Sequence, residues 1–249
     1  TNVGAKHSLF NVFQALIDEG DEVIVPSPYW VSYPEMVKFS GGKPVFIETS
    51  EKTGFKITPE QLKAAITPRT KILVLNSPCN PTGAIYSRKE LEALGEVLKD
   101  TKIIVASDEM YEKLNYEGEF VATAAVSKDM FNRTITINGL SKCGAMPGWR
   151  FGYMASPFKE LNAAVNKLQS LTQAGAIPAL LGKADEDIAY MKGEFKKRRD
   201  LGVEMINAIP GLSVLKPDGA FYFFINCSAV EPDSMKFCKE LLEKAKVAV

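Results

Sequence analysis

The sequence predicts an α/β fold: a mostly parallel sheet covered by helices, followed by part of a smaller α+β domain. Two observations support this expectation. Short β-rich runs alternate with helical patterns as far as residue 168, and such alternation is typical of parallel strands joined by helical crossovers. Near residue 185 the alternation gives way to a long, charged helical pattern. We therefore expect the second part of the fold to begin there.

The expected strands share short runs of β-branched and aliphatic residues. They are residues 22–25, 44–48, 71–75, 102–106, 134–137 and 150–154. A helical pattern follows each run. Two helix starts carry a reciprocal cap, in which a hydroxyl side chain is followed three residues later by Gln or Glu. Thr58 precedes Gln61 in this way, and Ser87 precedes Glu90.

The first and last helices of this part are also predicted by pattern. Near the N-terminus, the apolar residues that fall on one helical face are Leu9, Phe10, Phe13, Leu16 and Ile17. A later helix is expected from Ser156-Pro157 through residue 168.

The C-terminal part is expected to contain a long helix from residue 185, strands at 212–216 and 220–225, and a helix from about residue 232. We expect a large domain over residues 1–184, and a connecting helix with part of a small domain over 185–249. The sequence contains no internal repeats and no flexible Gly/Ser linker. The two parts should therefore pack closely.

Composition argues against several classes of function. Thirty basic residues balance thirty acidic ones, so no net charge favours nucleic acid or an anionic membrane surface. No apolar stretch is long enough to cross a bilayer and no leader resembles a signal peptide, so we expect a cytoplasmic protein. The single histidine, His7, argues against serine–histidine catalysis and histidine-rich metal sites. We expect no metal, and reduced cysteines.

Polar side chains follow three expected strands, at the edge where open α/β sheets bind ligands. Asn80 follows the third strand, Asp108 and Tyr111 follow the fourth, and Ser141 and Lys142 follow the fifth. Each has a structural alternative. Asn80 lies in a turn-forming Asn-Pro-Thr-Gly, an aspartate after a strand often caps a helix, and a lone lysine is usually solvated. Their combination favours a catalytic site.

An anion site is expected at the start of the first helix. Gly4 and Ala5, followed by Lys6, leave the amides there unobstructed. Arg150 lies eight residues after Lys142 and could form a bidentate hydrogen bond to a phosphate. Trp30 offers a flat face for an aromatic ring, with a core tryptophan as the alternative.

The sequence strongly resembles the fold-type I, class I aminotransferases, in the branch that includes bacterial aspartate aminotransferases. The resemblance covers nearly the whole chain, and the matching phrases occur in family order. They are Gly4-Ala5-Lys6, Pro26-Ser27-Pro28-Tyr29-Trp30, Asn80-Pro81-Thr82-Gly83, Ser107-Asp108-Glu109-Met110-Tyr111, and Ser141-Lys142 leading to Gly148-Trp149-Arg150. The resemblance implies that the large domain binds pyridoxal 5′-phosphate (PLP), as in the major domain of PLP-dependent transferases.

The resemblance also implies catalytic roles. Lys142 would bond covalently to PLP and then move the proton that the reaction transfers. Asp108 would keep the pyridine nitrogen protonated, which makes the ring an electron sink. Tyr111 and Asn80 would hydrogen-bond the 3′-oxygen.

The remaining residues would hold the cofactor. Trp30 would stack on the ring, and the amides of Gly4, Ala5 and Lys6 would hold the phosphate together with Arg150. Ser141 is a weaker phosphate candidate, because some relatives place a hydroxyl three residues before the lysine, where this chain has Gly139.

Some family features fall outside this pattern. The family normally carries a segment before Gly4 that helps close the site and reaches the neighbouring subunit. It also carries a segment after Val249 that supplies the arginine for the substrate α-carboxylate. Residues 169–176 look shorter than the family pattern, in a region expected near the dimer interface. We therefore expect either a truncated chain or ordered pieces of a longer one.

The leading hypothesis for function is amino transfer from an L-amino acid to a 2-oxo acid, with aspartate and 2-oxoglutarate as the pair, by a homodimer. Aromatic, prephenate or broad-range amino transfer is the nearest alternative. An alternative from another class is a PLP-binding regulatory domain that senses amino acids without converting them. Such regulators normally carry a DNA-binding module before the PLP fold.

Overall fold

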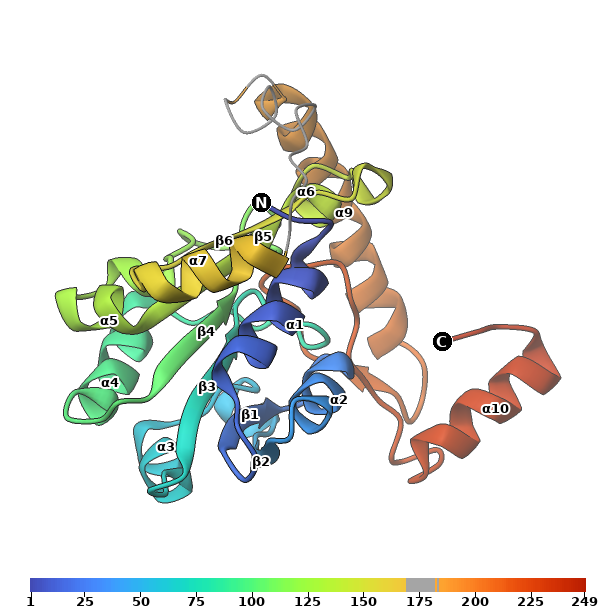
Figure 1. Cartoon of the computed structure of the whole chain (residues 1–249). Helices are drawn as coiled ribbons and strands as arrows, with labels where there is room; N and C mark the ends of the chain where they lie inside the picture. Colours follow the sequence, from blue (N-terminus) through green and yellow to red (C-terminus); the bar gives the residue numbers. More distant parts are fainter. Residues whose placement is uncertain (169–181, 183) are drawn as a thin grey trace.

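The computed structural model describes residues 1–168, 182 and 184–249. Its centre is a six-stranded sheet with the order β2-β1-β3-β4-β5-β6, and helices cover both of its faces (Figure 1). Strands β1 to β5 are parallel, whereas β6 runs antiparallel to β5. The α/β fold class predicted from the sequence is confirmed.

Each expected run of the large sheet overlaps an observed strand. The strands are β1 Glu22–Ser27, β2 Lys43–Glu48, β3 Thr70–Asn76, β4 Ile104–Asp108, β5 Thr134–Gly139 and β6 Gly152–Ala155. The last strand begins later than expected because Arg150 has a φ of 50°, in the left-handed region that a strand cannot contain. Arg150 therefore belongs to the turn before β6.

One face of the sheet is covered by α1 (Ala5–Leu16), α2 (Ser32–Phe39) and α7 (Lys159–Leu168). The apolar face predicted for the first helix is confirmed, because Leu9, Phe13 and Ile17 are buried in a cluster that includes sheet residues. Phe10 and Leu16 are partly buried against the same cluster. This packing fixes the start of α1 beside the carboxyl ends of the central strands.

The opposite face is covered by α3 (Pro59–Ala65), α4 (Arg88–Leu98) and α5 (Lys128–Arg133). Leu91, Leu94 and Leu98 of α4 recur at helical spacing and are fully buried. Burial of each such side chain contributes about 2 kcal/mol.

Both predicted reciprocal caps are present on this face. The Gln61 amide donates to Thr58 Oγ1 at 3.2 Å, and the Glu90 amide donates to Ser87 Oγ at 3.4 Å. Short elements complete the large part of the fold: η1 Glu51–Thr53, η2 Thr123–Ala125, α6 Leu140–Cys143 and η3 Pro147–Trp149.

The C-terminal part contains α9 (Asp185–Asn207), β7 (Ser213–Val214), β8 (Ile225–Asn226) and α10 (Ser234–Ala245). Strands β7 and β8 form an antiparallel pair, and α10 lies apart from the layers of the large sheet (Figure 1).

The prediction of a strand over residues 220–225 is wrong, apart from Ile225 in β8. The backbone before and at the start of this run pairs with loops of the large part instead of with a neighbouring strand. The Gly219 amide donates to the Gly83 carbonyl at 3.0 Å, and the Ala220 amide donates to the Leu114 carbonyl at 2.9 Å.

The four cysteines are free thiols. In the parts of the chain that the structure describes, no helix is both long enough and apolar enough to cross a membrane. The expectation of a shortened stretch at residues 169–176 lies outside the described residues.

Candidate active site

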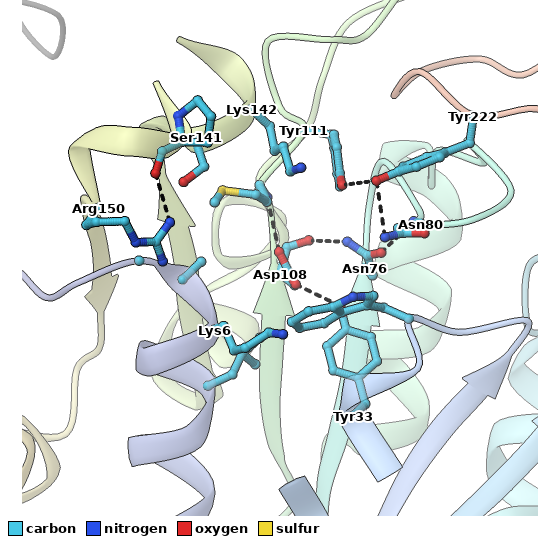
Figure 2. Close-up of a pocket in the computed structure, with 16 residues that line it drawn as sticks. Lys6, Tyr33, Asn76, Asn80, Asp108, Tyr111, Ser141, Lys142, Arg150 and Tyr222 are labelled. Atoms are coloured by element: carbon cyan, nitrogen blue, oxygen red, sulfur yellow. Dashed lines mark hydrogen bonds between the residues drawn. The ribbon is translucent and has the colours of Figure 1, made fainter. Parts of the chain in front are cut away.

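A cavity of about 230 Å³ lies at the carboxyl ends of β3, β4 and β5 (Figure 2). It brings together every site residue that the sequence predicts. These are Gly4, Ala5, Lys6, Trp30, Asn80, Asp108, Tyr111, Ser141, Lys142 and Arg150. Three further polar residues, Tyr33, Asn76 and Tyr222, also line it.

Asp108 is the last residue of β4 and is 6% exposed. Its Oδ2 accepts a hydrogen bond from the Tyr33 hydroxyl at 2.7 Å, and its Oδ1 accepts one from the Met110 amide at 3.2 Å. Burial raises the pKa of Asp108, while these two hydrogen bonds oppose the rise. Both donors are neutral, so the carboxylate is well placed to receive a cationic group from the cavity.

Asn76 ends β3 and joins the loops that follow β3 and β4. Its Nδ2 donates to the Asp108 carbonyl at 2.9 Å, and its Oδ1 accepts from the Asn80 amide at 2.7 Å. These bonds place the Asn80 side chain beside the end of β4.

A group of three polar side chains forms the wall next to Asp108 (Figure 2). The hydroxyls of Tyr111 and Tyr222 lie 2.8 Å apart, and Asn80 Nδ2 donates to the Tyr222 hydroxyl at 3.4 Å. Burial raises the pKa of the Tyr111 phenol well above its ordinary value. The Tyr111 hydroxyl therefore stays protonated over the physiological pH range and can donate a hydrogen bond.

Lys142 lies in α6, the short helix directly after β5, and its side chain points into the cavity (Figure 2). Its Nζ lies 5.4 Å from the centroid of the Phe221 ring. Gly139 ends β5, and a Cβ added there would lie 2.6 Å from the Phe151 carbonyl oxygen. The absence of a side chain at Gly139 therefore permits the close approach of strands that holds α6 over the cavity.

The start of α1 meets Arg150 at the other end of the cavity (Figure 2). Arg150 Nη2 donates to the Val3 carbonyl at 2.9 Å, and Nη1 donates to the Pro147 carbonyl at 2.9 Å. Gly4 has a φ of 116°, and no described side chain caps the helix there. The Gly4 amide donates to Asn2 Oδ1 at 3.1 Å, and the His7 amide donates to the Gly4 carbonyl at 2.9 Å. The amides of Ala5 and Lys6 have no partner among the described residues and are free for an anion.

Trp30, Lys6 and Ser141 complete the predicted set. Lys6 Nζ lies 4.8 Å from the centroid of the Trp30 ring. The same ring packs edge-on against Tyr33 with centroids 5.3 Å apart. Ser141 is half-buried and adjoins Lys142 at the cavity wall. Trp30 therefore forms a wall of the cavity as well as a packing contact.

Sequence reasoning missed Tyr33, Asn76 and Tyr222. Tyr33 lies three residues after Trp30, at the start of α2, and Asn76 directly follows an apolar run. Those signals were available. Tyr222 lies between aromatic residues in an apolar run, and nothing in that pattern indicates a polar role.

Comparison with known proteins assigns the family. The model of aminotransferase class I and II matches residues 1–249. This chain belongs to that family. Among its relatives, the aspartate aminotransferase of Geobacillus stearothermophilus is 48% identical over 99% of this chain and 66% of its own length. The aspartate/prephenate aminotransferase of Thermus thermophilus is 45% identical over 99% of this chain and 65% of its own length.

Solved structures of the family agree with the fold. The aspartate aminotransferase of Rhizobium meliloti matches with a TM-score of 0.94 at 43% identity, over 100% of this chain and 66% of that one. The Thermus thermophilus aspartate aminotransferase with maleate matches with a TM-score of 0.93 at 44% identity, with the same coverage. The present aminotransferase-family chain thus spans just under two thirds of the length of these relatives.

Proposed function

We propose that this protein is a PLP-dependent aminotransferase that moves an amino group from L-aspartate to 2-oxoglutarate. The observation that carries the proposal is the placement of Asp108 and Lys142 in one cavity. Asp108 is buried with neutral hydrogen-bond donors, and a buried carboxylate is stabilised by a cationic partner. The protonated pyridine nitrogen of PLP is such a partner, and Lys142 supplies the amine that PLP chemistry requires.

The residues that line the cavity support PLP as its ligand. The amides of Ala5 and Lys6 at the start of α1, next to Gly4 and with Arg150 beside them, would hold the phosphate; Ser141 adjoins the same end. Trp30 would cover the ring. Asn80 and Tyr111 would hydrogen-bond the 3′-oxygen, because their polar groups lie together on the wall next to Asp108.

PLP, when bound, supplies an electron sink for a carbon that loses a proton. We assign to Lys142 the transfer of that proton from the substrate α-carbon. The other lysine of the cavity, Lys6, places its Nζ 4.8 Å from the Trp30 ring centroid, beside the ring that would cover the cofactor. Asp108 would hold the proton on the pyridine nitrogen, and Tyr33 would orient the Asp108 carboxylate through their 2.7 Å hydrogen bond.

The choice of substrates is supported by the relatives. Two with 48% and 46% identity are named aspartate aminotransferase, and one solved structure of the family is described with maleate, a four-carbon dicarboxylate. Other relatives at 43% to 45% identity are named aspartate/prephenate aminotransferases, one of them as probable. Prephenate is therefore the second acceptor to test.

We extend the proposal to the organisation of the protein. Residues 1–184 form the PLP-binding large domain, and residues 185–249 form a connecting helix and part of a small domain. The separate β7–β8 sheet supports this division. The protein acts as a cytoplasmic homodimer on small-molecule substrates, without a nucleic-acid or membrane partner. Light scattering on the purified protein tests the homodimer.

The first experiment uses borohydride on the PLP-loaded protein. We expect a yellow protein whose absorption band disappears on reduction, with the pyridoxyl group on Lys142 in the peptide map. A label on Lys6 would contradict the assignment.

The second experiment is a panel of amino donors and 2-oxo acids. We expect aspartate with 2-oxoglutarate to give the highest kcat/KM, with prephenate and aromatic oxo acids as the informative comparisons. A protein that binds PLP on Lys142 but turns over no pair in the panel would instead support the regulatory alternative.

A further inference from the structure

Residues 217–222, here called the crossing segment, connect the C-terminal part to the wall of the cavity. The Gly219 amide donates to the Gly83 carbonyl at 3.0 Å, and the Ala220 amide donates to the Leu114 carbonyl at 2.9 Å. Gly83 lies in the loop that carries Asn80, and Leu114 lies three residues after Tyr111. The crossing segment is therefore held by the same two loops that carry the proposed 3′-oxygen ligands.

Two glycines make this contact possible. A Cβ added at Gly83 would lie 2.6 Å from the Gly219 carbonyl oxygen, and one added at Gly219 would lie 2.7 Å from the Leu114 carbonyl oxygen. Both distances are too short for non-bonded atoms. The crossing segment is thus in direct backbone contact with both loops, without intervening side chains.

A buried arginine holds the crossing segment from its other side. Arg199 of α9 is 4% exposed, and its Nη1 donates to the Pro217 carbonyl at 2.9 Å. Its Nη2 lies 2.9 Å from Glu117 Oε1. The Tyr116 hydroxyl donates to the Ala220 carbonyl. These contacts fix the position from which the Tyr222 side chain enters the cavity.

The Tyr222 hydroxyl meets both proposed ligands of the 3′-oxygen (Figure 2). Asn80 Nδ2 is a donor, so the Tyr222 oxygen accepts from it at 3.4 Å. If Tyr111 donates its proton to the 3′-oxygen, its own oxygen remains free to accept. The proton between the two phenols, 2.8 Å apart, must then come from Tyr222.

We infer that Tyr222 is a positioning residue that orients the Tyr111 phenol and strengthens it as a hydrogen-bond donor to the cofactor's 3′-oxygen. This inference rests on the proposed function. Hydrogen bonds arranged in a chain polarise one another, so a bond donated to the Tyr111 oxygen makes the Tyr111 hydroxyl a better donor. Tyr222 acts through Tyr111 and has no direct role in proton transfer.

The test is an absorption titration of the PLP-loaded protein, which follows the protonation of the link between PLP and Lys142. In Tyr222→Phe, a weaker bond from Tyr111 leaves more negative charge on the 3′-oxygen, and that charge holds the nearby proton more tightly. We expect the titration midpoint to rise by about half a pKa unit. Replacement of Tyr222 by 3-fluorotyrosine, a more acidic phenol, should move the midpoint in the opposite direction.

Tyr116→Phe is the matched control, because it removes a hydroxyl that holds the crossing segment and lies outside the cavity lining. We expect it to lower the melting temperature while leaving the titration midpoint within about 0.1 of the unsubstituted protein, since the Arg199 bond and the two backbone bonds still hold the crossing segment with the Tyr111 bond in place. A shift equal to that of Tyr222→Phe would mean that general loosening causes the effect, and would overturn the inference.

Two other outcomes would also overturn it, and they are distinguishable. An unchanged midpoint in both Tyr222 variants, in a protein that forms the Lys142 link, would remove the inference and leave the proposed function intact. Failure of the unsubstituted protein to form a borohydride-reducible link would remove both. The titration measures no turnover, so neither outcome depends on the choice of substrate.

Discussion

Two neighbouring carboxylates at the end of β4 have different surroundings. Asp108 lies on the cavity side, and Glu109 lies on what is here called the rear side, against Ser107 and Thr123. Asp108 lines the cavity. Glu109 is 2% exposed, and its Oε1 accepts from the Ser107 hydroxyl at 2.9 Å and from the Thr123 amide at 3.0 Å. Burial raises the pKa of both groups, and raises that of Glu109 to about 7.

A buried carboxylate without a partner is unfavourable when it is ionised. The two sides avoid this state in different ways. On the rear side the surroundings of Glu109 are protein, so the group binds a proton of its own as its pKa approaches neutrality. On the cavity side Asp108 can instead receive a cation from outside the chain. The comparison shows that burial and a raised pKa do not by themselves identify a catalytic carboxylate. Access to a cavity that also holds an amine separates the two cases.

The largest expected effect would come from removing that amine. Lys142→Ala should lower kcat by about 10⁴-fold or more, because it removes both the covalent attachment and the proton carrier. Its unfolding free energy should stay within about 0.5 kcal/mol of the unsubstituted protein, since half-buried Lys142 makes no structural ion pair with the described residues. Steady-state kinetics and urea unfolding measure the two quantities. Lys63→Ala, at an exposed position of α3, is the matched control and should change neither.

The comparison itself is tested by removing each carboxylate in turn. Asp108→Asn should lower kcat/KM by about 10²-fold or more, because a neutral amide cannot stabilise the protonated pyridine. Glu109→Gln should keep kcat/KM within about threefold, because it changes only the rear side. Equal losses in the two variants, measured with the same substrate pair, would erase the distinction between the two sides.

The pH dependence of the unfolding free energy tests the raised pKa of Glu109 separately from catalysis. Its pKa is raised from 4.5 to about 7 on folding, so the folded state binds the proton more tightly. The resulting stabilisation is complete below about pH 4.5 and is lost as the pH rises through 7; a shift of this size corresponds to about 3 kcal/mol. Urea unfolding of Glu109→Gln from pH 4.5 to 8 should show a correspondingly smaller decline. Parallel curves for the two proteins would mean that Glu109 is already ionised at acidic pH.

The smallest expected effect on activity comes from a variant far from both carboxylates, which serves as a control for loss of stability alone. Thr58→Ala removes the side chain that caps α3 and should lower the unfolding free energy by about 1 kcal/mol. Catalysis should not change. A loss of activity comparable to that of Asp108→Asn would show that kinetics report general destabilisation, and would weaken the interpretation of the cavity-side variants.

The fold was predictable wherever local pattern and tertiary structure agree. The runs that became β1 to β5 are apolar because helices cover both faces of the sheet, and the caps at Thr58 and Ser87 depend only on neighbouring residues. The run at 220–225 misled the prediction because its aromatic residues pack against distant loops. Its composition is that of a strand, but its backbone hydrogen bonds go to loops and not to a neighbouring strand.

Some residues of the site were likewise predictable from the sequence and others were not. Asp108 and Lys142 follow strands, so topology alone brings them to one edge. Tyr33 and Tyr222 reach that edge through contacts with residues 75 and 111 positions away. A phenol surrounded by apolar side chains has the sequence signature of a core residue, and only the folded structure shows which hydroxyl it meets.

The separation of Tyr111 from Tyr222 also has a consequence for how the protein is made. The two residues lie 111 positions apart, and ribosomes add about 5–20 residues per second. The last strand of the sheet ends at Ala155, so the sheet, Asp108 and Lys142 have all been synthesised roughly 3–13 s before Tyr222 is added. A nascent chain can assemble the phosphate and pyridine contacts during that interval, but the phenol pair closes last. The colour of the bound cofactor would then report the moment at which the phenol pair completes the cavity wall in the newborn protein.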